Sequence, residues 1–555
     1  MSSLVEPTWQ TRSKQYRDFA AAKIPEAWRL DAKWTADVGP ESSQNVLAIP
    51  GQSRLMTDQE LHITEAYDAV ALLEKLASGE LSSVDLTTAF CKRAAIAQQL
   101  TFCLTETFFD QGIERARYCD AYLAEHKNPI GPLHGLPISI KDSFNVKGIA
   151  SSIGFVSFLD RDPVQNDSAL VKVLLDLGAV LYVKTNVPQS LMTPDSENNV
   201  FGRTLNPNKL CLGAGGSSGG EGALVRFKGC PIGVGTDIAG SIRIPAYVNG
   251  TFGLRPTARR IPYGGQTSPG RPGAFGVLPV AGPLARSLRD IKTFMKAVLE
   301  YECWKYDSAI ISTPWRSPST STTIDGQKSQ SLKIGYLLED PRLPLHPTVL
   351  RTMKTAIAQL EKPGTHTLLD LSSQIPENTI NVAMKSGFTS FLMDPDNTSS
   401  NHIKASGEPV VASFAMASMP ELKEFKPDLQ DVWRLNVERA QYQALFRDLF
   451  VNNDLDVLLM PVHCSTAVKH DLYGLPIYTI LGNLIDHPAT TLPYLKADKK
   501  LDAEYIRDVK YTPAYEPNTI EGAPCGIQLI GRPMRDEELL VHSQIIADSL
   551  GIQPL

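Results

Sequence analysis

The chain has 555 residues, of which 43% are hydrophobic and 21% charged, with a formal net charge of -6. These values are ordinary for a globular protein, and without a basic excess they give no indication of a nucleic-acid partner. No stretch reaches the roughly 20 apolar residues of a membrane span, and the N-terminus has no apolar signal segment. We therefore expect a cytoplasmic protein with no transmembrane segment.

Eight cysteines are scattered along the chain without a CxxC pair. None has zinc-ligand spacing to a histidine, since His463 and Cys464 are adjacent and face opposite ways on a strand. We expect mostly buried, free thiols and no metal or organic cofactor.

Residues 1–63 mix charged side chains with Trp9, Trp28 and Trp34. Three tryptophans predict that this segment is an arm packed on the rest of the molecule. Residues 64–555 are expected to form the second and main part.

Three amphipathic helices are expected after the arm, over residues 64–79, 84–100 and 113–126. The first is predicted to open at Thr64 and stop at Gly79, because apolar residues recur at helical spacing between them. Ser82 or Ser83 is the expected cap of the second helix.

Short apolar runs then alternate with helical patterns. The runs Leu136–Ile140, Val180–Lys184 and Pro231–Val234 predict strands, and residues 168–178 predict a helix. This rhythm predicts an α/β fold: one large α/β/α domain in which helices cover a mixed, twisted sheet. The polar segments 311–331 and 394–409 are interpreted as insertions into that domain.

Six glycines lie between Gly213 and Gly222, around Ser217 and Ser218. Glycine is entropically costly, so such a run indicates a backbone that turns tightly or approaches a ligand closely. A dinucleotide fingerprint fails because position 218 is serine, and no GK[ST] follows for a phosphate-binding loop.

A second glycine-containing turn carries Ser241, within GVGTDIAGSIRIPA. A serine at such a turn exposes its hydroxyl while backbone N–H groups converge beside it, as an oxyanion hole requires. The expected donors are the amides of Ile238, Ala239, Gly240 and Ser241. A plain Gly-Ser turn is the alternative.

Lys141 ends the apolar strand LPISIK. A lysine there either reaches solvent or has its pKa lowered by desolvation, in which case it can act as a base. No carboxylate is expected on its face of the strand.

Taken together, Lys141, GGSSGG with Ser217, and DIAGSIR with Ser241 resemble the amidase signature family. The resemblance covers roughly residues 65–550 and includes GPLHGLPISIKD, KTNVPQS, FGRTLNP, TFGLRPT, GPLARSL and GAPCGIQLIGRP. Within the family the chain is most similar to the fungal acetamidase and general amidase branch. Its SSGGEGAL and TNVPQS segments also resemble fatty-acid amide hydrolase.

The resemblance implies a Ser–cis-Ser–Lys triad. Ser241 is the implied nucleophile, Ser217 the cis-peptide serine that relays its proton and lines the substrate site, and Lys141 the neutral base. Ser218 is assigned a supporting hydrogen bond. Leu191 matches a substrate-lining position, with an ordinary core leucine as the alternative.

Two features of the Ser241 motif affect the shape of its turn. The family usually has glycine at the position of Ala239, and a methyl group there could narrow the oxyanion turn. Asp237 and Arg243 flank the nucleophile and are expected to hold the turn by pairing, with a solvated charge pair as the alternative.

We therefore expect an amidase that hydrolyses small aliphatic or aromatic amides to an acid and ammonia or an amine. The alternatives are an amidotransferase-type subunit that hands ammonia to a partner, and a catalytically silent scaffold of the same fold. A homodimer is possible.

Overall fold

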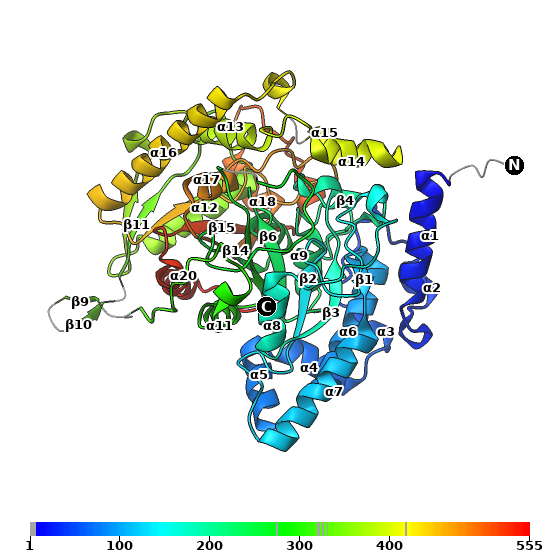
Figure 1. Cartoon of the computed structure of the whole chain (residues 1–555). Coiled ribbons are helices and arrows are strands. Elements are labelled where there is room, and N and C mark those ends of the chain that lie inside the picture. The colour runs from blue at the N-terminus through cyan, green and yellow to red at the C-terminus, as the bar shows by residue number, and fades with distance from the viewer. Residues whose placement is uncertain (1–6, 274–275, 319–321, 325–326, 330, 417–418) are drawn as a thin grey trace, which may run out of the picture.

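A mixed sheet runs through the whole structure (Figure 1). The computed structural model describes residues 7–273, 276–318, 322–324, 327–329, 331–416 and 419–555. Within these ranges eleven strands form the sheet. In spatial order they are β1 (Leu104–Thr107), β3 (Val180–Thr185), β2 (Pro137–Lys141), β6 (Ile232–Asp237), β8 (Val280–Ala285), β7 (Phe252–Arg255), β14 (Ala489–Lys496), β15 (Pro524–Ile530), β13 (Val457–Met460), β11 (Lys333–Tyr336) and β12 (Thr367–Asp370).

Parallel pairing occurs in two separate parts of this order. Strands β3, β2 and β6 are parallel to one another, as are β13, β11 and β12. The remaining pairs, including the whole run from β6 to β13, are antiparallel. Strands β2, β3 and β6 coincide to within three residues with the three strands expected from apolar runs, and the predicted α/β class with a mixed sheet is confirmed.

The described helices are α1 (Trp9–Ala22), α2 (Ala32–Thr35), α3 (Ile49–Ser53), α4 (Asp58–Ala66), α5 (Ala69–Ser78), α6 (Ser83–Thr101), α7 (Phe109–His126), α8 (Ala169–Asp176), α9 (Gly219–Arg226), α10 (Arg243–Asn249), α11 (Leu288–Leu299), α12 (Pro347–Leu360), α13 (Thr379–Phe391), α14 (Thr398–Ser406), α15 (Ala412–Met416), α16 (Leu429–Asn452), α17 (Thr479–Ile485), α18 (Lys499–Asp502), α19 (Pro517–Ile520) and α20 (Asp536–Leu550). Two small hairpins, β4 (Glu197–Asn198) with β5 (Gly202–Arg203) and β9 (Thr322–Ile324) with β10 (Gln327–Ser329), lie outside the main sheet.

Helices cover the sheet on both faces. Thr490 on β14 hydrogen-bonds Ser543 of α20 at 2.8 Å. The next residue, Thr491, is paired with Gly253 of β7, whose missing side chain leaves room for Ala246 of α10. Because successive strand residues point to opposite faces, α20 and α10 lie on opposite sides of the sheet. Helix α11 packs against α20, and α9 packs against α10.

The first predicted helix is interrupted, contrary to the expectation of one segment over 64–79. Tyr67 is extended, and the Asp68 side chain caps a new helix by accepting a hydrogen bond from the Ala71 amide. The Arg286 guanidinium bonds the carbonyl oxygens of Thr64 and Tyr67, so these groups are satisfied without a continuous helix.

The other helix predictions agree more closely with the structure. Gly79 ends α5 with φ of 73°. Ser82 caps α6 by accepting a hydrogen bond from the Asp85 amide. Helix α7 begins at Phe109, four residues before the expected start.

The N-terminal arm lies against loops and the edge strand β1. In α1, Arg12 donates to the Val156 carbonyl at 3.0 Å and Arg17 to the Val200 carbonyl at 2.7 Å. Lys23 pairs with the buried Glu106 of β1 at 2.7 Å. The division of the chain into two parts stays a prediction, and its boundary at 63/64 falls inside α4.

The two predicted insertions differ in structure. The described part of 311–331 contains the β9–β10 hairpin, whereas 394–409 contains α14 instead of an irregular loop.

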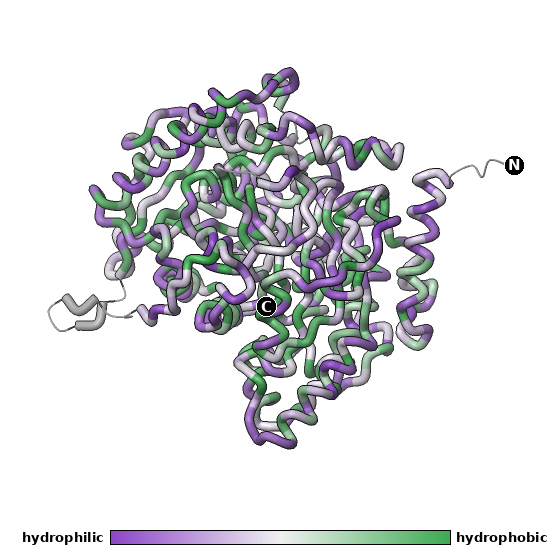
Figure 2. Tube along the Cα trace, in the orientation of Figure 1, coloured by the Kyte–Doolittle hydropathy of each residue, from purple (hydrophilic) through white to green (hydrophobic). Residues whose placement is uncertain are grey.

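Hydrophilic and hydrophobic residues alternate along the peripheral helices α1 and α16 (Figure 2), as expected for helices with one face in solvent. One cluster of buried hydrophobic side chains has members along the sequence from Ile24 to Leu550.

Candidate active site

Lys141 is the last residue of β2 and is fully buried. Helices α6 and α9 pack against β2, and every residue of this strand is buried. The Nζ atom donates to Ser217 Oγ at 2.7 Å and to Thr236 Oγ1 at 2.7 Å. Burial lowers the pKa of Lys141 to about 7, against the opposing charges of Asp237 and Glu221.

Ser217 is presented to Lys141 by the glycine-rich loop. The Gly216–Ser217 peptide bond is cis. A side chain at Gly216 would place its Cβ 2.3 Å from the Thr193 carbonyl oxygen, and Gly215 has φ of 78°. These two glycines are therefore required by a close backbone approach and by a left-handed conformation.

Ser218 connects the two serine loops. Its amide donates to the Ser241 carbonyl at 3.1 Å. Its hydroxyl donates to the Thr236 carbonyl and accepts from the Thr236 amide, both at 3.3 Å. This placement agrees with a supporting hydrogen bond.

Ser241 lies in the loop between β6 and α10, and Asp237 organises that loop. The carboxylate accepts from the Gly240 amide at 2.8 Å and the Ile242 amide at 3.1 Å. It also forms a buried ion pair with Arg243 at 2.9 Å. Burial raises its pKa, but Arg243 and Asn483 outweigh burial and lower it to about 2. The solvated-charge-pair alternative is therefore wrong.

The expected set of oxyanion donors is narrowed by this geometry. The Gly240 N–H is engaged by Asp237, so Gly240 is not a free donor. Among the described residues, the amides of Ile238, Ala239 and Ser241 have no partner.

A pocket opens beside Ser241. The lining is apolar apart from Thr193 and Ser241, and it consists of Leu191, Met192, Thr193, Pro194, Gly216, Ile238, Ala239, Ser241, Ile244, Phe388, Phe391 and Pro476. Leu191 is thus placed at the pocket, and the aromatic walls come from α13. No described residue of 311–331 lines it.

Glu221 contradicts the expectation that no carboxylate lies on the face of the strand that carries Lys141. It is fully buried and accepts hydrogen bonds from Ser139, two residues before Lys141 on the same face of β2, and from Thr185 at 2.8 Å. Burial raises the pKa of Glu221 to about 8, against the hydrogen bonds from Ser139 and Thr185 and the nearby Lys141.

Sequence reasoning also missed Thr236, Thr479 and Asn483. Thr236 could have been found, because it lies on the same strand face as Val234 and directly precedes the Asp237 loop. Thr479 donates to the Ala239 carbonyl at 2.6 Å, and Asn483 donates to Asp237 at 2.9 Å. Neither lies in a motif.

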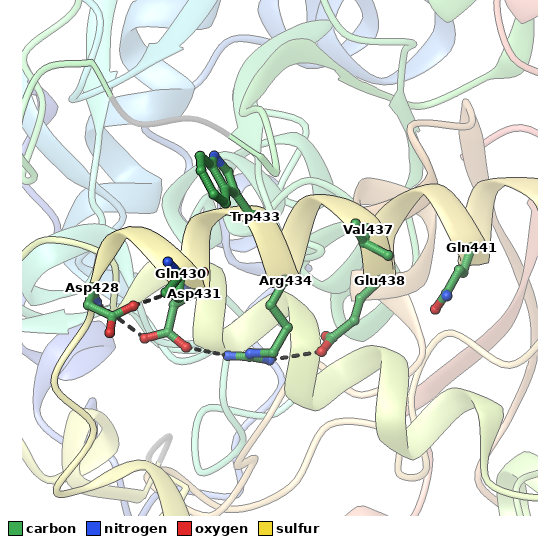
Figure 3. A pocket seen from close by; sticks show the side chains of 8 residues that line it. All are labelled: Asp428, Gln430, Asp431, Trp433, Arg434, Val437, Glu438 and Gln441. Atoms are coloured by element: carbon green, nitrogen blue, oxygen red, sulfur yellow. Dashed lines mark hydrogen bonds and ion pairs between the residues drawn. The ribbon is translucent and has the colours of Figure 1, made fainter.

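A second hollow lies apart from this site. Figure 3 shows this hollow beside α16. The hollow contains none of the predicted site residues and is lined by Asp428, Gln430, Asp431, Trp433, Arg434, Val437, Glu438 and Gln441.

None of the helices in the described ranges is long and apolar enough to cross a membrane. In the same ranges no group of three or more His, Cys, Asp or Glu side chains could hold a metal ion.

Known proteins match this chain over most of its length. Residues 85–540 match the family model described as Amidase. An amidase of Gibberella moniliformis is 40% identical over 99% of this chain and 100% of that protein. An acetamidase of Emericella nidulans is 37% identical over 98% of both. A solved structure of fatty acid amide hydrolase covers 98% of this chain and 95% of its own, with a TM-score of 0.87 and 33% identity.

The fold, the site and these relatives define an amide hydrolase. The chain belongs to the amidase signature family, which confirms the resemblance inferred from its motifs.

Proposed function

We propose that the protein hydrolyses small aliphatic or aromatic amides through an acyl-enzyme on Ser241. The observation that carries the proposal is the fully buried hydrogen bond of 2.7 Å between Lys141 Nζ and Ser217 Oγ, next to the loop that holds Ser241. A buried lysine with a lowered pKa bonded to a hydroxyl is suited to accept a proton.

In the attack step, Ser241 Oγ bonds to the amide carbonyl carbon and transfers its proton to Ser217. Ser217 passes its own proton to neutral Lys141. The carbonyl π electrons move to oxygen, and the amides of Ile238, Ala239 and Ser241 stabilise the oxyanion.

In the collapse step, the carbon–nitrogen bond breaks and its electron pair stays on nitrogen. Lys141 and Ser217 return the proton to that nitrogen, because an amine anion is a poor leaving group. Water then gives a proton to the same pair and attacks the acyl carbon. The bond between that carbon and Ser241 Oγ breaks, the pair returns the proton to Ser241, and the acid is released.

The pocket supports an uncharged acyl group. Its walls include Leu191, Ile244, Phe388 and Phe391, with no charged side chain among the described lining residues. A charged acyl group would be desolvated there without a partner. The name of the acetamidase relative also favours small amides.

The purified chain, without partners, should therefore hydrolyse neutral aliphatic and aromatic amides faster than amides of the same size that carry a charge. Mass spectrometry of a panel of amides, esters and lactams measures this directly. Turnover that requires a second protein would favour the amidotransferase alternative.

Ser241→Ala should abolish turnover while the thermal unfolding temperature stays close to that of the wild type. A fluorophosphonate should label Ser241 in the wild type, because an activated serine beside an oxyanion hole reacts where ordinary serines do not. Peptide mass spectrometry locates the adduct. A label on Ser218 with Ser241 unmodified would contradict the assignment.

A further inference from the structure

We propose that Thr479 is a positioning residue that orients the oxyanion loop, residues 238–241. The inference rests on the proposed function, because it assigns the loop amides to the developing oxyanion. Thr479 is the first residue of α17, 240 positions along the chain from Ala239.

The contact between Thr479 and the loop is a direct hydrogen bond between buried residues. Thr479 is fully buried, Ala239 is 8% exposed, and the hydroxyl donates to the Ala239 carbonyl oxygen at 2.6 Å. The other acceptor within reach, the Pro476 carbonyl, is 3.3 Å away, so the hydroxyl bonds Ala239 preferentially.

This hydrogen bond fixes one side of the peptide unit between Ala239 and Gly240. The other side is fixed by Asp237, which accepts from the Gly240 amide at 2.8 Å. A peptide unit is planar, so a bond at its carbonyl and a bond at its N–H together set its orientation. The amides of Ala239 and Ser241 flank this unit and are oriented by it.

The loop approaches Thr479 so closely that position 240 must be glycine. A Cβ at this position would lie 2.2 Å from Thr479 Oγ1, and Gly240 has φ of 127°. The hydroxyl therefore occupies the space that a side chain would fill, and no other group lies between it and the loop.

Helix α17 is held one turn later to the residues on either side of the loop. Asn483 donates to Asp237 at 2.9 Å and accepts from Arg243 at 2.5 Å. Residues four apart lie on the same side of a helix, so Thr479 contacts the loop while Asn483 contacts the residues that flank it. The Thr479 hydroxyl thus has a fixed position from which to orient the Ala239 carbonyl.

The test compares Thr479→Val, which removes the hydroxyl at nearly constant volume, with Thr479→Ser, which keeps it. Loss of one oxyanion donor costs about 10²- to 10³-fold in kcat, so misorientation should cost about 10- to 100-fold. We expect Thr479→Val to lower kcat by this factor with little change in KM, and Thr479→Ser to restore most of it. Thr352→Val is the matched control, because this buried hydroxyl also donates to a backbone carbonyl, at 2.8 Å, but in α12.

A second readout separates oxyanion positioning from general packing. A trifluoromethyl ketone that carries the acyl group of the best amide forms a tetrahedral adduct with Ser241, whereas the matching alcohol binds without forming one. Thr479→Val should weaken ketone binding in proportion to kcat/KM and leave alcohol binding unchanged. Equal weakening of both inhibitors would overturn the proposal, as would a Thr479→Val variant with wild-type kcat.

Thermal unfolding of each variant accompanies these assays, and Thr479→Ala replaces Thr479→Val if the latter does not fold. Ser241→Ala is measured in parallel. Turnover by Ser241→Ala would refute the proposed function itself, whereas an inactive Ser241→Ala beside a fully active Thr479→Val would refute only the role of Thr479.

Discussion

Two buried acids whose pKa values are shifted in opposite directions lie near Lys141. Asp237 is held ionised by Arg243, with a pKa of about 2, whereas burial raises the pKa of Glu221 to about 8. The charge of Asp237 is balanced by its ion pair with Arg243, and the raised pKa of Glu221 reduces the charge of this carboxyl group near neutral pH. Desolvation of Lys141 is therefore the dominant effect, and the amine is free to accept a proton at neutral pH.

The pH dependence of turnover follows from this balance. Protonated Lys141 cannot accept a proton, so kcat/KM should be low below pH 7 and rise through a group that titrates near 7. Lys141→Ala should lower kcat by about 10²- to 10⁴-fold and remove this limb. Lys141→Arg should not restore activity, because a guanidinium stays protonated. A pH–rate profile of the wild type, Lys141→Ala and Lys141→Arg tests whether Lys141 acts as the base. A mostly active arginine variant would contradict the proton-relay role.

Glu221 can be tested independently. If its carboxyl group is neutral, Glu221→Gln should leave the position of the acid limb nearly unchanged, because no charge is removed. An ionised Glu221 would instead stabilise protonated Lys141, so its removal would move the limb to lower pH. The same pH–rate measurement distinguishes the two, and a shift of one unit or more would show that Glu221 is charged.

At the scale of elements, the site depends on loops that follow strands and touch one another through glycines. Gly216→Ala would place a Cβ 2.3 Å from the Thr193 carbonyl, a backbone group that cannot turn away. We expect this variant to lower the free energy of unfolding by about 1–3 kcal/mol and to reduce turnover. Gly39→Ala is the control, since nothing lies within 4 Å of its added Cβ. Chemical denaturation measures both, and equal stability of the two variants would contradict the close-approach argument.

Much of this architecture could be predicted from local patterns. Apolar runs located β2, β3 and β6, and the glycine-rich segments located both serine loops. The break before α5 could not be predicted, because it depends on Arg286, more than 200 residues away. Thr479 and Asn483 were missed for the same reason: an isolated threonine or asparagine in an apolar helix gives no sign of which loop it will contact.

At the scale of the whole molecule, the N-terminal arm balances charge in the core. Glu106 is 3% exposed and pairs with Lys23, so Lys23→Met would leave its carboxylate without that cation. We expect the free energy of unfolding to fall by about 1–3 kcal/mol. Lys14→Met should change it by less than about 1 kcal/mol, because Lys14 pairs with Asp18 at the surface. Thermal or chemical denaturation compares them, and equal effects would contradict this role of the arm.

The order of the strands also determines when the site can be completed during synthesis. Strand β7 pairs with β14, which begins at Ala489, and the oxyanion loop is held by Thr479 and Asn483. A nascent chain therefore already contains Lys141, Ser217 and Ser241 while the partners of their loops are still untranslated. Contacts of such high sequence separation form late, so catalytic competence should appear only after the last quarter of the chain has left the ribosome and closed the sheet.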